Sequence, residues 1–179
     1  MEEYNEEKNM QQREIKLGIP SYITVESEEG SFIGEQNSSK FEKEDICVEA
    51  NENGEIWLTA DTAPVKTVKL RWNTPLERTS KILGGVWERT YGDAEWKGMS
   101  GTRFMPWYFL ALNEGVVTGY GVKVRPSAMC FWQADTRGIT LVLDVRCGGT
   151  GVVLSGRKLL AAEVVAMQAD DCTSFEAAK

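Results

Sequence analysis

Residues 45–60, DICVEANENGEIWLTA, have the pattern of two short β-strands joined by a tight turn. The two flanking runs, DICVEA and EIWLTA, contain Ile, Val and Trp, which favour strands. Between them, Asn53 and Gly54 both tolerate a positive φ, as a two-residue hairpin turn requires. This stretch therefore predicts an antiparallel hairpin.

Residues 65–72, VKTVKLRW, alternate between apolar and polar side chains. Val68 and Leu70 would face one side of a strand, whereas Lys69 and Arg71 would face the other. Such a pattern is typical of a strand that has one face in the core and one face in water.

Similar runs recur along the chain from Ser21 onward, separated by turn residues at intervals of about ten residues. They are SYITVE, SFIGE, WYFLALN, VVTGYGVKV, AMCFWQA, ITLVLDVR, GVVLSG and KLLAAEVVAM. The last run contains helix-favouring Leu, Ala and Glu, but Val164 and Val165 favour a strand. The sequence predicts an all-β fold, an antiparallel β-sandwich over residues 19–170.

Acidic residues are concentrated at the beginning of the chain. The first 50 residues hold 13 acidic and 5 basic side chains, whereas the rest hold 14 and 15. Residues 1–18 are therefore predicted to be a flexible acidic arm. Without a basic face, we expect no nucleic-acid partner, and no apolar run is long enough to cross a membrane. Taken as the start of the protein, this segment lacks the features of a secretory signal and predicts a cytoplasmic location.

Histidine is absent from the sequence. This excludes Ser-His-Asp triads, Cys-His nucleophile pairs and histidine-ligated zinc. The four cysteines are widely spaced, with no C-x-x-C pair, and they are expected to be buried free thiols. We expect no metal and no cofactor.

The end of the chain predicts the start of a helix. Thr173-Ser174-Phe175-Glu176 has the form of a capping box, and the EAAK sequence that begins at Glu176 favours a helix. Residues 171–179 are therefore expected to be a linker or first helical turn that leads into another element.

A long segment from Thr79 to Arg103 shows no strand periodicity and is rich in glycine, aromatic and charged residues. Long loops inside compact domains are usually functional or part of an interface. Aromatic rings stack on sugar faces, and carboxylates and guanidinium groups bind hydroxyls, so this composition suits a sugar ligand. The same aromatic side chains would equally suit docking to another domain.

Carboxylates in this segment raise the question of glycosidase catalysis, which usually requires a pair of them. Glu88, Asp93 and Glu95 lie on a glycine-rich loop, which gives little support for a fixed separation. We therefore expect them to form ion pairs with Arg89 or Arg103.

Several blocks of the chain resemble a known family. ILGGVWERTYGDAEW, RFMPWYFLALNEG, TGYGVKVRPSAMCFWQAD and ITLVLDVRCGG occur in the order found in the N-terminal domain of melibiase-type alpha-galactosidases of glycoside hydrolase clan D. The resemblance covers about Lys69 to Lys179. In that family an N-terminal β-sandwich, often called a supersandwich, precedes a (β/α)8 barrel that carries two catalytic aspartates. Neither aspartate has a counterpart in this chain.

The resemblance implies a non-catalytic N-terminal domain that shapes the active-site mouth and supports the barrel. Its partners would be the C-terminal (β/α)8 barrel, an alpha-galactoside or related carbohydrate and, in a homo-oligomer, further copies of the chain. The loop from Leu83 to Arg103 would project toward the substrate pocket, in the same chain or in a neighbouring subunit. The implied substrate-binding residues are Trp87, Glu88, Arg89, Tyr91, Asp93 and Trp96.

Two other functions remain open at this stage. A free-standing carbohydrate-binding module would expose a row of aromatic rings and bind sugar alone. A structural or oligomerisation domain would bury Trp87 and Trp96 against a partner.

Overall fold

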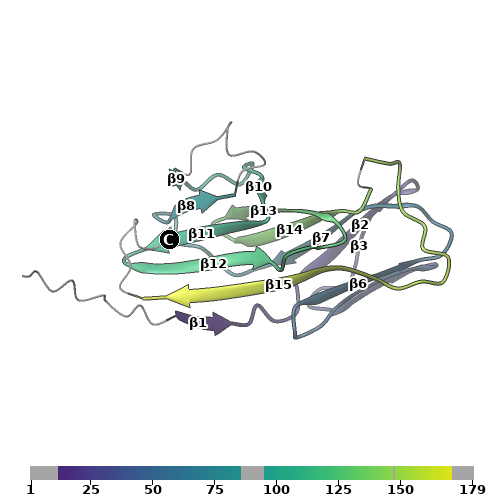
Figure 1. Cartoon of the computed structure of the whole chain (residues 1–179), viewed down its shortest axis with the longest axis horizontal. Coiled ribbons are helices and arrows are strands. Elements are labelled where there is room, and N and C mark those ends of the chain that lie inside the picture. The colour runs from purple at the N-terminus through teal and green to yellow at the C-terminus, as the bar shows by residue number, and fades with distance from the viewer. Residues whose placement is uncertain (1–11, 86–94, 147, 171–179) are drawn as a thin grey trace, which may run out of the picture.

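The computed structural model describes residues 12–85, 95–146 and 148–170. These residues form two antiparallel sheets packed face to face, and no helix occurs among them (Figure 1). The predicted all-β antiparallel sandwich is confirmed. The expected helix start at residues 171–179 lies outside the described residues.

The first sheet has six strands in the order β10-β13-β14-β7-β2-β3. Its strands are β2 (Tyr22–Ser27), β3 (Gly30–Ile33), β7 (Val65–Trp72), β10 (Met105–Pro106), β13 (Met129–Asp135) and β14 (Gly138–Asp144). On β7, Val68 and Leu70 are buried and Lys69 and Arg71 are partly exposed, as the alternation predicted.

The second sheet has nine strands in the order β4-β5-β6-β15-β12-β11-β8-β9, with β1 also paired to β15. Its strands are β1 (Gln12–Ile15), β4 (Lys40–Lys43), β5 (Ile46–Ala50), β6 (Glu55–Ala60), β8 (Lys81–Gly84), β9 (Lys97–Gly98), β11 (Tyr108–Asn113), β12 (Val116–Val122) and β15 (Leu159–Ala169).

Strand β15 is the central element of the nine-stranded sheet (Figure 1). Its first half pairs with β6 and its second half pairs with β1, while β12 occupies the opposite edge of the second half. Val164 and Ala166 are buried, whereas Val165 and Met167 are more exposed, which is a strand alternation. The predicted strand is therefore confirmed over the alternative helix.

The turn of the 45–60 hairpin is docked on β15. The Asn51 side-chain oxygen accepts hydrogen bonds from the backbone N–H groups of Asn53 and Glu55, both at 3.0 Å. Gly54 has φ 84°, and its carbonyl accepts the N–H of Val164 at 2.8 Å. A Cβ at Gly54 would lie 2.3 Å from the Val164 carbonyl oxygen, so this position needs glycine. The predicted hairpin is confirmed, but its connection spans residues 51–54, and only Gly54, not Asn53, has a positive φ.

Large aromatic side chains fill the space between the sheets. Phe109 and Tyr120 stack with their ring centroids 4.8 Å apart, and Trp132 lies 5.9 Å from Phe109 and 6.1 Å from Trp72. Each indole N–H is satisfied, that of Trp72 by the Gly18 carbonyl and that of Trp132 by the Trp107 carbonyl. Each such ring buries a large apolar area and so stabilises the core strongly.

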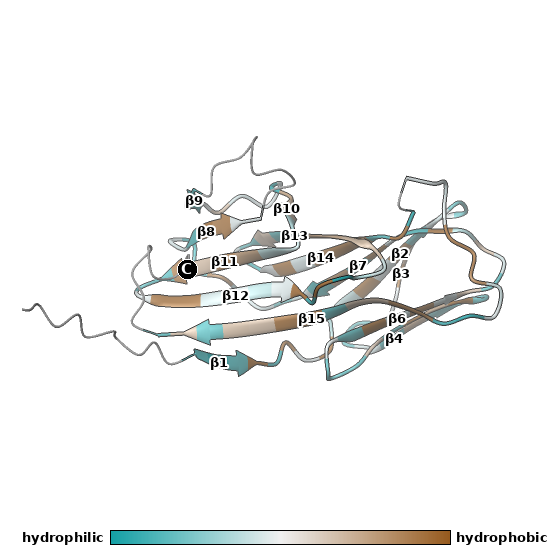
Figure 2. Cartoon of the chain, in the orientation of Figure 1, coloured by the Kyte–Doolittle hydropathy of each residue, from teal (hydrophilic) through white to brown (hydrophobic). Residues whose placement is uncertain are grey.

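Three local expectations differ from the structure. Gln12–Ile15, expected in the flexible arm, form β1, which is hydrophilic up to its last residue (Figure 2). Residues 151–156, GVVLSG, contain only an isolated bridge from Val152 to Val65. Residues Lys40–Lys43, which lie outside every predicted strand, form an additional strand, β4.

Cys47 is partly buried and Cys130 is fully buried, and both are free thiols. Burial raises the pKa of the Cys47 thiol, which reduces its reactivity. Cys147 and Cys172 lie outside the described residues. In the part of the chain that the structure describes, no helix has the length and apolar character needed to span a bilayer.

Candidate functional site

The predicted substrate-binding segment leaves and re-enters the nine-stranded sheet at one edge. β8 pairs with β11, which places Gly84 opposite Phe109, and β9 returns along β8. The expectation that residues 79–103 lack strands is therefore wrong for 81–84 and 97–98. Trp87, Glu88, Arg89, Tyr91 and Asp93 lie outside the described residues, so their predicted roles stay predictions.

Gly85 holds the segment where it leaves β8. Its N–H donates to the Tyr108 carbonyl at 2.9 Å. A Cβ at this residue would lie only 2.1 Å from the Pro106 carbonyl oxygen. Only glycine allows the backbone to approach the β10–β11 corner this closely.

At that corner, Trp107 carries the chain from the six-stranded to the nine-stranded sheet. Its φ is 68°, a left-handed conformation that costs an aromatic residue roughly 1–3 kcal/mol. Three hydrogen bonds made by its backbone hold it there. Its N–H donates to the Cys130 carbonyl at 3.1 Å. Its own carbonyl accepts from the Val122 N–H at 3.1 Å and from the Trp132 indole N–H at 3.3 Å. Strained residues held by both sheets are typical of functional sites.

Trp96 is the one predicted site residue that the structure describes. It is partly buried and packs against a cluster on the outer face of the nine-stranded sheet. That cluster contains Val117 and Ala169, which are buried, and Leu110 and Leu112, which are partly buried. Its ring therefore has a packing role, whatever it contributes to ligand binding.

We call this surface the apolar face. It is formed by Leu110, Leu112, Val117, Met167 and Ala169 on strands β11, β12 and β15. Their neighbours along the strands, such as Phe109, Tyr120 and Ala166, point into the core. Met167 is 47% exposed. A sheet with apolar residues on both faces normally has a second surface packed on it.

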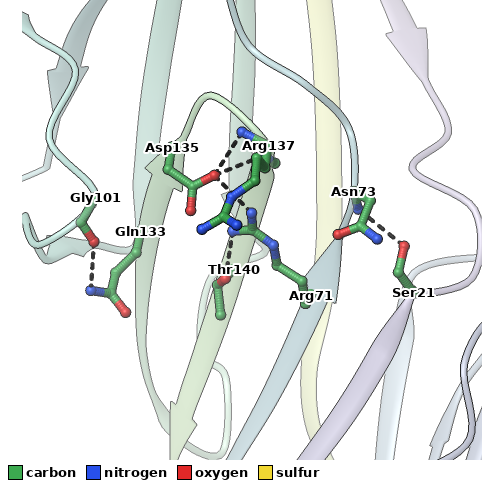
Figure 3. Close-up of polar contacts among 9 residues, drawn as sticks. Ser21, Arg71, Asn73, Gly101, Gln133, Asp135, Arg137 and Thr140 are labelled. Atoms are coloured by element: carbon green, nitrogen blue, oxygen red, sulfur yellow. Dashed lines mark hydrogen bonds and ion pairs between the residues drawn. The ribbon is translucent and has the colours of Figure 1, made fainter.

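The outer face of the six-stranded sheet is polar instead. Arg71 on β7 donates to Asp135 at 2.8 Å and to the Thr140 hydroxyl at 3.1 Å, so it bridges across β14 (Figure 3). Farther along the same face, Glu26 accepts from Lys69 and Thr67. We call this surface the polar face.

Electrostatics keep the carboxylates of the polar face ionised. Burial acts to raise the pKa of Asp135, but the hydrogen bond from Arg71 and the N–H groups of Arg137 and Gly138 outweigh it, so the pKa is lowered. The hydrogen bonds from Lys69 and Thr67 likewise lower the pKa of Glu26. Both groups therefore remain negative at neutral pH.

The return leg of the segment contacts the polar face. The Gly101 carbonyl accepts a hydrogen bond from the Gln133 side chain at 3.1 Å (Figure 3). Phe104 packs edge-on against Phe131, with ring centroids 5.2 Å apart. The segment is therefore anchored on both sheets, a link that the sequence pattern did not reveal.

For Glu95 and Arg103, which the structure describes, the partners differ from the predicted ion pairs. Glu95 lies 3.4 Å from Lys97, and Arg103 donates to the Ile82 carbonyl at 3.3 Å. Within the described ranges no group of three His, Cys, Asp or Glu side chains could hold a metal ion.

Comparison of the chain with protein-family models found no match. Comparisons with curated proteins and with solved structures found none either. The family resemblance therefore rests on the quoted sequence blocks alone.

Proposed function

We propose that this chain is a non-catalytic N-terminal domain of an alpha-galactosidase-like glycoside hydrolase. It shapes the mouth of the active site and supports a (β/α)8 catalytic barrel. The observation that carries the proposal is the fixation of the predicted substrate-binding loop from Leu83 to Arg103, which we call the recognition segment. Its two ends are held by β8 and β9, by the Gly85 contact with Tyr108, and by the Gly101 contact with Gln133. A recognition loop gains precision when a rigid scaffold fixes its ends.

The apolar face supports the second half of the proposal. It adjoins the recognition segment through Trp96 and offers partly exposed apolar side chains on an otherwise complete sandwich. A barrel packed on this face would bury that surface, and the segment beside it would then border the substrate pocket. A cytoplasmic location is part of the proposal, because the free thiol of Cys47 suits a reducing compartment.

A carbohydrate-binding module that acts without a barrel is the second candidate. It is favoured by aromatic side chains exposed around the strained corner, where Phe104 is 57%, Tyr108 is 48% and Trp107 is 36% exposed. Rings exposed at such a site can stack on sugars.

The test compares two preparations of the protein. One is the 179-residue chain made alone. The other is the whole protein or complex that contains this chain, purified from its source cells. We expect hydrolysis of an aryl alpha-galactoside only in the second preparation, because the chain lacks a counterpart of the catalytic pair. Turnover by the chain alone, or no glycosidase activity in either preparation, would contradict the proposal.

A further inference from the structure

A hollow of about 570 Å³ lies on the polar face. It is lined by Tyr22, Arg71, Asn73, Asp135, Arg137 and Thr140, which come from β2, β7, β13, β14 and the loops that follow β7 and β13. These residues belong to the described sheet and not to the recognition segment. Figure 3 shows Asp135, Arg137, Thr140, Arg71 and Asn73 gathered at one end of the strands.

The carboxylate of Asp135 is fixed through one of its two oxygens. Arg71 Nη2 at 2.8 Å, the Arg137 N–H at 2.7 Å and the Gly138 N–H at 3.1 Å all donate to Oδ1. No described residue donates a hydrogen bond to Oδ2. The hollow therefore contains a positioned acceptor with its hydrogen-bonding capacity available.

Donors lie beside this acceptor. Arg71 is immobilised by Asp135 and Thr140, whereas the Arg137 guanidinium and the Asn73 side-chain amide make no hydrogen bond to any described residue. Tyr22, opposite Arg71 in the β2–β7 register, supplies a partly buried aromatic ring. Acceptor, donors and ring thus line one hollow.

This combination selects a class of ligand. A sugar hydroxyl both donates and accepts, so it can bind a carboxylate oxygen and a guanidinium or amide together. The C–H face of a pyranose can lie against a tyrosine ring. An anion would pair with Arg137 but would leave the carboxylate of Asp135 without a donor from the ligand, whereas a sugar hydroxyl serves both groups.

We propose that the hollow lined by Tyr22, Arg71, Asn73, Asp135, Arg137 and Thr140 binds a neutral monosaccharide ring. The site is built by the sandwich itself and goes beyond the proposed support function, because it requires neither the barrel nor the recognition segment. Asp135 Oδ2 accepts from sugar hydroxyls, Arg137 and Asn73 donate to them, and Tyr22 packs on the ring.

The test is a titration of the 179-residue chain followed by two-dimensional 15N NMR. The probes are the methyl alpha-glycosides of galactose, glucose and mannose, with glycerol and sodium sulfate as comparison ligands. We expect at least one glycoside to shift the backbone amides of Asn73, Arg137 and Gly138 with millimolar affinity. Asp135→Asn and Tyr22→Ala should each weaken binding about tenfold, since each removes one main contact.

Matched control variants lie on the same face. Asp144→Asn removes a carboxylate whose two oxygens are both occupied by Arg146, and Thr24→Ala changes the next outward position along β2. Both should bind like the unmodified chain. If Asp135→Asn disturbs the fold, as its NMR spectrum would reveal, Tyr22→Ala decides the question.

Several results would overturn the proposal. They are no shift with any of the three glycosides, shifts that persist in both hollow variants, equal shifts with glycerol, and shifts with sulfate alone. The last result would instead identify an anion site.

Discussion

The two outer faces of the sandwich differ, although the strands beneath them alternate in the same way. On the six-stranded sheet, outward positions hold paired charges such as Arg71 with Asp135 and Lys69 with Glu26. On the β11–β12–β15 part of the nine-stranded sheet, outward positions hold Leu110, Val117 and Met167.

This difference has a physical consequence for each face. Paired charges and hydroxyls are stable in contact with water, whereas Leu, Val and Met in outward positions become favourable only when another surface covers them. The polar face is therefore suited to small polar ligands, and the apolar face is suited to a protein surface. Four experiments test this difference between the two faces.

The largest effect is expected from a charge on the apolar face. Val117→Asp should destabilise the fold by about 3 kcal/mol, because Val117 is only 7% exposed and packs with Ala169, Leu110 and Leu112. Thermal unfolding should show a fall in Tm of roughly 6–12 °C. The control Thr24→Asp, on the polar face opposite Lys69, should leave Tm almost unchanged. Equal losses for the two variants would abolish the distinction between the faces.

A smaller effect is expected from removing the aromatic ring that packs on the apolar face. Trp96→Ala should cost about 1–2 kcal/mol, less than a fully buried tryptophan, because Trp96 is only partly buried. Tyr22→Ala removes a partly buried ring from the polar face and should cost less than about 1 kcal/mol. Chemical denaturation of both variants measures the difference, and a Trp96→Ala protein as stable as the parent would show that the ring is not packing.

Self-association gives a third comparison. If the apolar face is a contact surface, the isolated chain should associate with itself at high concentration. Met167→Glu should then weaken the affinity of self-association about tenfold. Ile33 is even more exposed, at 71%, but belongs to the six-stranded sheet, so Ile33→Glu is the matched control. Sedimentation velocity over a range of concentrations distinguishes them, and an equal effect of both variants would remove the apolar face as the contact.

The smallest effect is expected from pH. The pKa values of Glu26, Asp135 and Asp144 are lowered in the fold by partners on the polar face. Their contribution to stability is therefore present above the unfolded pKa values, near 4, and is lost as the pH falls through the lower folded values. We expect Tm to decline by a few degrees below about pH 4, since these groups are partly exposed and screened.

The double variant Glu26→Gln, Asp144→Asn should show a flatter decline of Tm in the same acid range. Thermal unfolding between about pH 3 and pH 7 measures the two profiles. Parallel profiles would mean that these ion pairs do not contribute.

The sequence predicted the parts of the fold that depend on local patterns. The alternation in β7, the Asn53-Gly54 turn and the β-branched pair in β15 each act over a few residues, and the strands they predicted are present. β1 and β8 were missed, because edge strands such as β1 take their hydrogen bonds from distant partners and need no alternation. Residues 151–156 had the composition of a strand but pair only at Val152.

The candidate site was predictable only in part. The glycine-rich composition and the lack of strand periodicity marked the segment near Gly85, because glycine is unusual in a strand. No pattern in the sequence predicts the cluster of Arg71, Asp135 and Arg137. It forms because the β13–β14 turn brings Asp135 beside β7. Arg71 and Asp135, which form the ion pair, are separated by 64 residues in the sequence.

The position of β15 also governs when the protein can fold. β15 joins the β4-β5-β6 part of the nine-stranded sheet to the β12-β11-β8 part, and it pairs with β1 across a sequence separation of 155 residues at Arg13 and Gln168. On a ribosome, the edges of β6 and β12 emerge well before the strand that pairs with them. Pairing between strands so far apart in the sequence makes folding slow. Until β15 is synthesised, the unpaired edges of β6 and β12 can pair with other nascent chains. We therefore expect the folding yield in cells to depend on chaperones that shield these edges until β15 is synthesised.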